Sequence, residues 1–328
     1  RMLLNLDLHF PMKKGEYGRR ISELEKSMDF QLDLLQKQAV EEALTKGVVV
    51  VTGGPGTGKT TTINLMIRCF EMEKMDIVLA APTGRAAKRM TEATGYEAKT
   101  IHRLLEVSGG IEDGDSSHFE KNEDNPIEAD AVILDEMSMV DIHLMYSLLK
   151  AIVPGTRLIL VGDSNQLPSV GPGNVLKDII DSKAFSVVRL SKIYRQAESS
   201  HIVLNAHKIN AGELITLDNK NKDFFFFEKK DVRSVMGALV YLVKTRLPEY
   251  IGASPFEIQV LTPMRKGELG VEHLNEVLQY YLNPASESKK EKEGRTGVFR
   301  EGDKVMQVKN NYKLEWKITN AKGFSIEE

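Results

Sequence analysis

The stretch VVVVTGGPGTGKTTT, residues 48–62, decides the fold of the first half of this chain. Four consecutive valines are typical of a strand that is buried on both faces of a sheet. The strand leads directly into the pattern GxxxxGKT at residues 53–60, and a helical pattern begins near Thr61. A strand, a glycine-rich loop and a helix in this order predict a phosphate-binding loop. The pattern therefore predicts a protein that binds ATP or GTP.

Each part of this loop has a chemical task. Glycines let the backbone form a concave surface whose N–H groups point at phosphate oxygens, and the helix N-terminus adds the positive end of its dipole. Lys59 supplies a positive charge for the β and γ phosphates, and Thr60 supplies a hydroxyl group for Mg²⁺. A lone glycine-rich loop can be a simple turn, whereas the full pattern in this context is specific. The residues expected to contact the nucleotide here are Gly54, Pro55, Gly56, Thr57, Gly58, Lys59, Thr60 and Thr61.

Other apolar runs alternate with helical patterns as far as about residue 190. Alternation of this kind predicts βαβ units around a parallel sheet with helices on both faces, which is an α/β, doubly wound fold of the P-loop NTPase type. Strands are expected at residues 48–52, 77–81, 131–135 and 158–161.

The alternation resumes further along the chain and predicts a second, incomplete α/β unit. A helix is expected at residues 232–247, and strands are expected at residues 224–227, 258–262 and 304–308. The polar segment at residues 109–128 is interpreted as a surface excursion without chemistry. The predicted organisation is an N-terminal helical or linker segment at residues 1–34, a first domain at 35–185 and a second domain at 186–328, with a charged connector at 284–298.

Polar side chains follow two more of the expected strands. The strand at residues 131–134 ends in Asp135 and Glu136, and the strand at residues 158–161 leads to Gln166. The carboxyl ends of parallel strands meet at the edge of the sheet where ligands bind. Asp135 is expected to hold Mg²⁺ and Glu136 to act as general base, while Gln166 could sense the γ-phosphate. Two acids at a strand end can also occur by chance, but their register with the phosphate loop favours hydrolysis over binding alone.

Composition excludes several classes of protein. A net charge of -3 and a pI of about 6.2 exclude a protein that coats DNA through a uniformly basic surface, so nucleic-acid contacts must be local. The chain has one cysteine, Cys69, which excludes a disulfide framework and a cysteine metal site. Its apolar helical surroundings favour a buried structural thiol over a reactive one. No apolar run reaches the ~20 residues that a membrane span needs, so we expect a cytoplasmic protein.

Eight motifs in order resemble those of the RecD-like DNA helicases of the RecD/TraA type, in the 5′-to-3′ branch of superfamily 1. The resemblance is to the stand-alone bacterial type and to the alpha subunit of exodeoxyribonuclease V. It implies two RecA-like domains, ATP and Mg²⁺ as cofactors, and movement on single-stranded DNA in repair or recombination. The motifs are LQKQAVEEAL (35–44), GGPGTGKTT (53–61), APTGRAAKRM (81–90), TIHRLL (100–105), LDEMSMVD (134–141), VGDSNQLPSVGPG (161–173), IYRQ (193–196) and LTPMRKGELG (261–270).

The resemblance gives roles to three further residues at the nucleotide. Gln36 would read the adenine edge through its side-chain amide, which offers one donor and one acceptor. Tyr194 would pack on the adenine ring, and Arg195 would reach the γ-phosphate from the second domain. The residues alone leave open a surface glutamine at position 36 and a surface arginine at position 195. The difference matters because an arginine finger is worth roughly 10³ to 10⁵ in turnover.

The resemblance also implies contacts that hold the backbone of single-stranded DNA without reading its bases. His102 could instead be a structural histidine, and Arg265 could pair with a surface acid. The residues expected to contact DNA are Pro82, Thr83, Gly84, Arg85, Thr100, His102, Pro168, Ser169, Val170, Thr262, Pro263 and Arg265.

The chain departs from complete members of this family in two respects. It has no HKSQG-like motif and no final arginine motif, and its N-terminal region is shorter. We therefore expect a truncated helicase chain, a monomer whose other repair partners are not identifiable. Three alternatives stay open: an RNA helicase of the same superfamily, a P-loop phosphotransferase, and a nucleotide-binding module without hydrolysis.

Overall fold

The computed structural model describes residues 1–11, 16–28, 32–108, 118–194, 199–294, 297–306, 317–319 and 325–327. The chain divides into two compact units, unit 1 at Arg1–Phe226 and unit 2 at Phe227–Glu328. Each unit has its own architecture.

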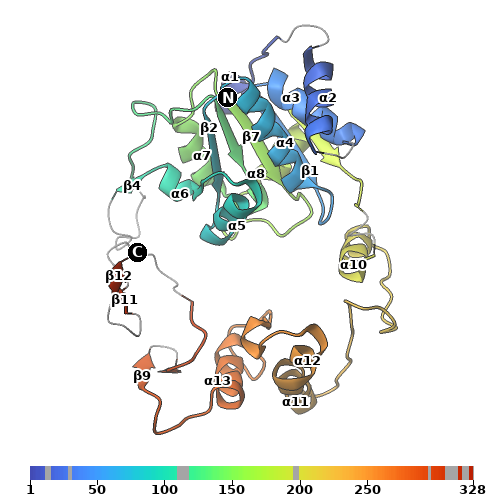
Figure 1. The fold of residues 1–328 in the computed structure, drawn as a ribbon, viewed down its shortest axis with the longest axis vertical. Helices are drawn as coiled ribbons and strands as arrows, with labels where there is room; N and C mark the ends of the chain where they lie inside the picture. Colours follow the sequence, from blue (N-terminus) through green and yellow to red (C-terminus); the bar gives the residue numbers. More distant parts are fainter. Residues whose placement is uncertain are drawn as a thin grey trace. The chain divides into compact units, whose positions relative to one another are not determined.

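Unit 1 is built on a six-stranded sheet in which all neighbouring strands run parallel (Figure 1). The strands are β1 Val48–Gly53, β2 Ile77–Ala81, β3 Ala98–Thr100, β6 Ala131–Leu134, β7 Arg157–Gly162 and β8 Ser186–Leu190. Their order across the sheet is β3-β2-β6-β7-β1-β8. Four of these strands confirm the apolar runs predicted from the sequence. β8 extends the sheet beyond residue 185, where the sequence places the end of the first domain.

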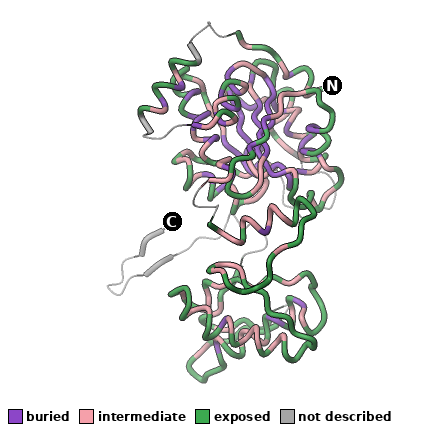
Figure 2. Tube along the Cα trace, turned by 90° about the vertical axis from the view of Figure 1, so that its right-hand side faces the viewer, coloured by how far each residue is buried: buried purple, intermediate pink, exposed green. Residues whose placement is uncertain are grey.

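Helices cover both faces of this sheet. They are α1 Met2–Leu6, α2 Glu16–Met28, α3 Leu34–Thr45, α4 Lys59–Met72, α5 Gly84–Thr94, α6 Ile101–Leu104, α7 Ile142–Lys150 and α8 Val175–Ser182. Val49 and Val51 of β1 pack in one apolar cluster with α2, α3, α4 and α5, whereas Val48 and Val50 pack in a second cluster with α1, α6, α7 and α8. Each buried valine contributes roughly 1.5–3 kcal/mol. Figure 2 shows the buried residues of unit 1 gathered in its interior.

Polar caps fix the residues at which four of these helices begin. Asp33 caps α3, Thr83 caps α5, Thr100 caps α6 and Asp141 caps α7, each through a side-chain oxygen that accepts a backbone N–H. One such cap contributes about 1 kcal/mol. α4 begins directly after Gly58, whose φ of 82° lies in the left-handed region. The helix therefore starts two residues before the position expected from the sequence.

The single cysteine belongs to the core of unit 1. Cys69 lies on α4 within the first apolar cluster and is fully buried. Burial raises the pKa of its thiol to about 12. The expected buried structural thiol is therefore confirmed.

Smaller elements complete unit 1. The strands β4 Val107–Ser108 and β5 His118–Phe119 form an antiparallel pair at the start of the polar excursion, of which residues 109–117 lie outside the described residues. A short 3₁₀ helix, η1 Met137–Met139, follows β6, and α10 His201–Asn210 follows β8.

Unit 2 consists mainly of helices. α11 Val232–Tyr241, the π-helical turn η2 Leu242–Arg246 and α12 Leu247–Ile251 follow one another directly and confirm the predicted helix. They are followed by η3 Pro255–Glu257 and α13 Val271–Leu282, the antiparallel pair β9 Glu291–Gly294 and β10 Gly297–Arg300, and the pair β11 Lys317–Thr319 and β12 Ser325–Glu327. Within the described part of both units, no helix has the length and apolar character to cross a membrane.

Four expectations for the second half of the chain are corrected. Residues 224–227 and 258–262 are irregular, so the strands predicted there are wrong. A strand is stable when a neighbouring strand takes its N–H and C=O groups, and no described strand pairs with these two apolar segments. The strand predicted at 304–308 is absent over residues 304–306, and its last two residues lie outside the described ones. The charged connector predicted at 284–298 contains β9 and the start of β10.

Candidate nucleotide-binding site

The candidate site lies where three neighbouring strands of unit 1 end. β1 runs into the loop at residues 54–58, β6 runs into Asp135 and Glu136, and β7 runs into the loop at residues 163–174. Because β6, β7 and β1 are adjacent and parallel, their carboxyl ends bring these loops to one edge of the sheet. Ligands bind at this edge in open parallel α/β folds.

The loop after β1 presents a row of unused N–H groups. Gly56 and Gly58 have φ values of 75° and 82°, in the region that favours glycine. The N–H groups of residues 56–60 donate to no described residue. Unsatisfied N–H groups at the start of a helix bind anions, because the helix dipole adds to their positive charge. The loop therefore has the geometry of a phosphate site.

Side chains bind the carbonyl groups of the same loop. Lys59 Nζ donates to the carbonyl oxygen of Gly53 at 2.6 Å and to that of Gly54 at 3.1 Å. The buried hydroxyl of Thr57 also donates to the Gly54 carbonyl, at 2.8 Å. These bonds hold the carbonyl groups while the N–H groups of residues 56–60 stay available.

Asp135 and Glu136 form a partly buried acidic pair. Burial raises the pKa of both carboxyls, and the charge of Asp135 adds to the rise for Glu136. The Glu136 N–H donates to Asp135 Oδ1 at 2.8 Å, and this hydrogen bond lowers the pKa of Asp135 against the effect of burial. The charges of Lys59 and Arg89 also lower both pKa values, so these two cations lie near the pair. A carboxylate of raised pKa is a better proton acceptor, which suits Glu136 to the role of general base.

The backbone of Glu136 is strained. Its φ of 54° and ψ of 40° place it in the left-handed region, which costs a residue with a side chain roughly 1–2 kcal/mol. Such strain is concentrated at functional sites. The strained residue is the one expected to activate water.

The loop after β7 is tied to the end of β1. The Ser164 N–H donates to Thr52 Oγ1 at 3.2 Å, and the Thr52 hydroxyl donates to Ser164 Oγ at 3.2 Å. Within the loop, Asp163 is buried, and its Oδ1 accepts the Asn165 N–H at 3.0 Å. The Gln166 N–H donates to the Asp163 carbonyl at 3.2 Å, and the Gln166 side chain is exposed. Gln166 therefore lies at the same edge as the phosphate loop.

A third group of side chains touches the phosphate loop from α3 and from the segment after β8. Tyr194 Oη donates to Asp33 Oδ2 at 2.7 Å, and the Tyr194 N–H donates to the Gly56 carbonyl at 3.2 Å. A Cβ atom on Gly58 would lie 2.9 Å from the Tyr194 ring and 3.0 Å from Gln36 Nε2. Burial, followed by the bond to Asp33, raises the pKa of the Tyr194 hydroxyl.

Gln36 is held on the first turn of α3. Its N–H donates to Asp33 Oδ1 at 2.9 Å, and its Oε1 accepts the Asp33 N–H at 3.4 Å, which completes a capping box. The residue is 1% exposed, and its Nε2 has no hydrogen-bond partner at normal distance, although the Gln36 amide lies close enough to the Tyr194 hydroxyl to lower its pKa. A buried donor of this kind needs an acceptor, so Gln36 can take a ligand beside the phosphate loop.

Thr60 and Asp135, the predicted Mg²⁺ ligands, offer a hydroxyl and a carboxylate. Oxygen donors are those that Mg²⁺ prefers, and it usually takes one or two protein oxygens besides phosphate and water. In the part of the chain that the structure describes, no group of three His, Cys, Asp or Glu side chains could hold a metal. A hydroxyl and a carboxylate are donors of the kind that Mg²⁺ takes when it binds together with a nucleotide.

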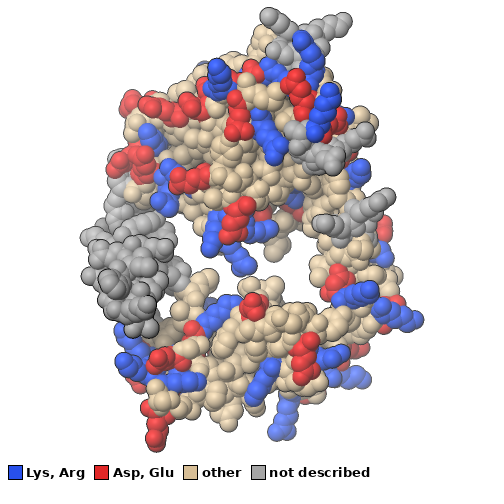
Figure 3. All heavy atoms as spheres, in the orientation of Figure 1, with Lys and Arg blue, Asp and Glu red and all other residues tan. Residues whose placement is uncertain are grey.

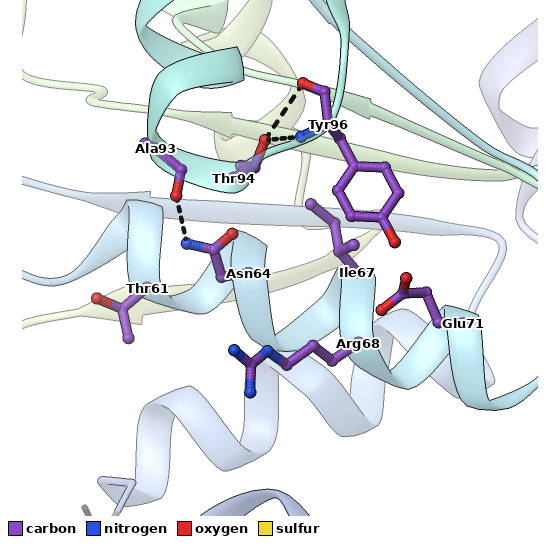
Figure 4. A pocket seen from close by; sticks show the side chains of 8 residues that line it. All are labelled: Thr61, Asn64, Ile67, Arg68, Glu71, Ala93, Thr94 and Tyr96. Atoms are coloured by element: carbon purple, nitrogen blue, oxygen red, sulfur yellow. Dashed lines mark hydrogen bonds between the residues drawn. The ribbon is translucent and has the colours of Figure 1, made fainter. Parts of the chain in front are cut away.

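A hollow of about 450 Å³ lies beside the phosphate loop, between α4 and the end of α5 (Figure 4). Thr61, one of the predicted nucleotide residues, lines this hollow. Asn64 Nδ2 donates to the Ala93 carbonyl at 3.0 Å and ties the two helices together.

The predicted DNA contacts of unit 1 lie after three strand ends at the site edge. Residues 82–85 lead from β2 into the first turn of α5, residues 100–102 lead from the end of β3 into α6, and residues 168–170 belong to the loop after β7. Arg85, His102, Pro168 and Val170 are exposed. On the face drawn in Figure 3, Lys and Arg side chains are interspersed with Asp and Glu. Charge there is mixed, in keeping with contacts that are local.

Three predicted hydroxyl contacts have partners in the protein. Thr83 Oγ1 accepts the Ala86 N–H at 3.2 Å, and Thr100 Oγ1 accepts the Arg103 N–H at 3.1 Å, so both cap helices. Ser169 Oγ donates to the Gly171 carbonyl at 3.0 Å. A hydroxyl that caps a helix can still donate its own proton to a phosphate.

His102 has a ring neighbour. Its imidazole centroid lies 6.0 Å from that of Phe119, with the two rings tilted by 51°. Desolvation lowers the pKa of His102, against the nearby charge of Asp141, which raises it. Both the base-stacking role and the structural role remain compatible with this position.

The remaining predicted contacts belong to unit 2 or lie outside the described residues. In unit 2, Thr262 Oγ1 donates to the Leu269 carbonyl at 2.7 Å, and Arg265 Nε donates to Glu272 Oε1 at 3.2 Å. Arg265 thus forms the ion pair that the sequence left open, and Pro263 is exposed beside it. Arg195 lies outside the described residues.

Three residues at the site were not identified from the sequence. Asp33 was detectable, because an acid three residues before Gln36 is a capping-box signal. Arg89 follows Arg85 by one helical turn of α5 and could have been placed near the acids. Nothing in the sequence indicates His207 of α10, whose Nε2 lies 3.2 Å from the Pro55 carbonyl oxygen.

Comparison with known proteins identifies two families in the chain. An AAA domain family matches residues 36–172, and the family described as ATP-dependent RecD-like DNA helicase SH3 domain matches residues 274–320. The first match covers the phosphate loop and five strands of the unit 1 sheet, and β8 lies beyond it. The second lies in unit 2 and runs into residues that are not described.

Curated relatives resemble most of the chain. The ATP-dependent RecD2 DNA helicase of Deinococcus radiodurans is 37% identical over 280 residues, which are 85% of this chain and 36% of that protein. The RecBCD enzyme subunit RecD of Mycobacterium tuberculosis is 36% identical over 287 residues, 75% of this chain and 48% of that protein. The Pif1 helicase of Candida albicans is 20% identical, with a TM-score of 0.43 over 67% of this chain and 55% of that structure. The chain thus spans about a third to a half of the length of these two curated relatives.

Proposed function

Because this chain is a relative of the RecD-like DNA helicases, we propose that it is the ATP-binding and ATP-hydrolysing part of an ATP-dependent DNA helicase. The observation that carries the proposal is the phosphate loop with unused N–H groups, next to which Lys59 lies close to Asp135 and Glu136. A binding module needs the loop alone, whereas hydrolysis also needs a base for water and a ligand for Mg²⁺.

In this proposal each residue of the site has one task. The N–H groups of residues 56–60 bind the phosphates, and Lys59 neutralises charge on the β and γ phosphates. Thr60 and Asp135 would hold Mg²⁺, which supplies further charge neutralisation when it is bound. Glu136 takes a proton from the attacking water, and exposed Gln166 reaches the γ-phosphate.

Recognition of the base is assigned to the group beside Gly58. Gln36 would bind adenine through its Nε2, and Tyr194 would pack against the ring. Arg195 would act as an arginine finger, so that domain closure and hydrolysis occur together. The contact of Gln36 and Tyr194 with the loop supports the first two assignments, and the third depends on the family relationship.

The proposed substrate is single-stranded DNA held by its backbone. The segments at residues 82–85, 100–102 and 168–170 would grip it at the edge of unit 1, and Thr262, Pro263 and Arg265 would do so from unit 2. Contacts of this type pass over any sequence, as a motor requires. Movement from 5′ to 3′, a role in repair or recombination with other repair proteins, a monomeric state and a cytoplasmic location complete the proposal.

The decisive test is ATP hydrolysis with and without single-stranded DNA, compared with the Lys59→Ala variant. We expect DNA to stimulate turnover and the substitution to reduce it on the order of 10² or more, because a preorganised positive charge at the phosphates is lost. The control is Lys177→Ala, which removes an exposed lysine from α8. A rate of ATP hydrolysis that does not change when DNA is added would contradict the proposed motor function. A rate that rises with RNA but not with DNA would indicate an RNA helicase instead.

A further inference from the structure

A histidine from α10 rests on the phosphate loop. His207 Nε2 lies 3.2 Å from the carbonyl oxygen of Pro55. A Cβ atom on Gly54 would lie 2.7 Å from His207 Cε1 and 3.3 Å from Nε2, so the imidazole covers the Cα of Gly54. α10 comes after the motifs of the nucleotide site in the sequence and contains none of the family's motifs. It nevertheless contacts the phosphate loop.

The contact with His207 explains why a glycine occupies position 54, which the backbone conformation there does not explain. Gly56 and Gly58 need a missing side chain because their φ values are positive, whereas the φ of Gly54 is not. The GxxxxGKT pattern also allows any residue at position 54. The space at Gly54 is occupied by His207, and an alanine there would bring its methyl group to within 3.0 Å of the ring.

The bond to Pro55 also determines the direction of a phosphate-binding group. In a planar trans peptide the C=O of one residue and the N–H of the next point in opposite directions. A donor that holds the Pro55 carbonyl therefore fixes the direction of the Gly56 N–H, which donates to no described residue. Tyr194 N–H acts in the same way on the Gly56 carbonyl, and so on the N–H of Thr57.

We propose that His207 is a positioning residue of the nucleotide site: it holds the peptide between Pro55 and Gly56 so that the Gly56 N–H faces the phosphates of a nucleoside triphosphate. The inference rests on the proposed ATP site and adds a residue to it. The imidazole donates from Nε2 and does not touch the nucleotide. Its effect is therefore on phosphate binding and not on recognition of the base.

The first test compares His207→Leu, which removes the donor, with His207→Gln, whose Nε2 can replace it. For the leucine variant we expect the KM for ATP and the Kd for ADP to rise about three- to tenfold, the range of one net hydrogen bond. The value of kcat should change little, because the lost interaction is equal in the ground state and the transition state. The glutamine variant should recover most of the affinity, and the ratio of ATP to GTP affinity should stay as in the wild type.

A second test uses the space that the ring fills. Gly54→Ala should weaken ATP binding in the wild type but have little effect in a His207→Ala background, where the ring is gone. Additive effects of the two substitutions would overturn the proposal. Thermal unfolding without nucleotide would reveal whether His207→Leu folds. If it does not, this double-mutant cycle still tests the proposed role of His207.

The control is His201→Gln on the same helix, whose partner is Asp223 and not the loop. An equal loss of affinity in this control would mean that α10 matters as a whole, and would overturn the specific role of His207. Failure of this inference and failure of the proposed function are distinguishable. A wild-type chain that binds no ATP refutes the function, whereas wild-type affinity in His207→Leu and in the Gly54→Ala variant refutes only the inference.

Discussion

At the scale of the residue, the role proposed for Glu136 opposes the stability of the fold. Burial and the charge of Asp135 disfavour its ionised form, and its left-handed backbone adds strain. An uncharged glutamine or a protonated glutamic acid would destabilise the folded state less at this position. The general base that hydrolysis needs is a charged, partly buried carboxylate, and the fold tolerates it at a cost in stability.

We therefore predict that Glu136→Gln abolishes ATP hydrolysis, preserves ATP binding and raises the thermal midpoint. The folded protein holds the pKa of this carboxyl above its usual value of 4.5, so the folded state binds the proton more tightly than the unfolded state. Ionisation above that pH then lowers stability, and the loss grows as pH rises toward the folded pKa.

The measurement is thermal unfolding of the wild type and the Glu136→Gln variant at pH 5 and pH 8 without nucleotide. The stability gained by the variant should be larger at pH 8. A variant that is less stable than the wild type at pH 8, or that still hydrolyses ATP at the wild-type rate, would contradict this account.

At the scale of the element, the first turn of α3 combines a helix cap with ligand positioning. Asp33 Oδ1 caps the helix, while Oδ2 accepts the Tyr194 hydroxyl at 2.7 Å. The same carboxylate thus orients both residues assigned to the adenine ring. The roles of its two oxygens can be tested separately, because serine at position 33 can still cap the helix but cannot accept the Tyr194 hydroxyl.

We predict that Tyr194→Phe and Asp33→Ser each raise the KM for ATP about two- to tenfold, since each removes one net hydrogen bond. Serine still caps a helix, so stability should change little, whereas Asp33→Ala should also cost about 1 kcal/mol of unfolding free energy. Steady-state kinetics and chemical denaturation of the three variants provide the measurement. Equal unfolding energies for Asp33→Ser and Asp33→Ala would mean that the cap contributes nothing.

The elements also show what could be predicted from the sequence. The valines of β1 and the GxxxxGKT pattern specify a buried strand, a turn and a helix locally, and this part of the fold was predicted correctly. The strands expected at residues 224–227 and 258–262 were wrong, because an apolar run becomes a strand when a partner pairs with it. The position of His207 depends on how α10 packs against a loop about 150 residues earlier, and no local pattern encodes that.

At the scale of the whole molecule, the two units differ in how much core each possesses. Unit 1 contains two apolar clusters on either side of its sheet. In the described residues of unit 2, by contrast, Val243 and Leu274 are the buried apolar side chains. Tyr280, Leu261 and Met306 are among the large side chains that unit 2 leaves exposed. Burial of apolar area is the main stabilising contribution to folding, so unit 1 should be far more stable than unit 2.

Amide hydrogen exchange of this chain should reveal the difference. We predict slow exchange in β1, β6 and β7, with protection that increases further when ATP is added, because a ligand that binds the folded state stabilises it. Residues 232–251 and α13 should exchange much faster in the same sample. Comparable protection of α13 and β1 would show that unit 2 has a stability of its own that its burial does not explain.

The buried thiol of α4 makes the chain convenient for fluorescence work. Cys69 is fully buried with a pKa of about 12, and thiol-directed dyes react with exposed thiolates. A cysteine introduced at Val170, whose side chain is fully exposed on the loop after β7, would then be labelled selectively without replacing the native one. A dye at that position would report in real time when a strand of DNA reaches the loop, and whether it does so before or after ATP binds.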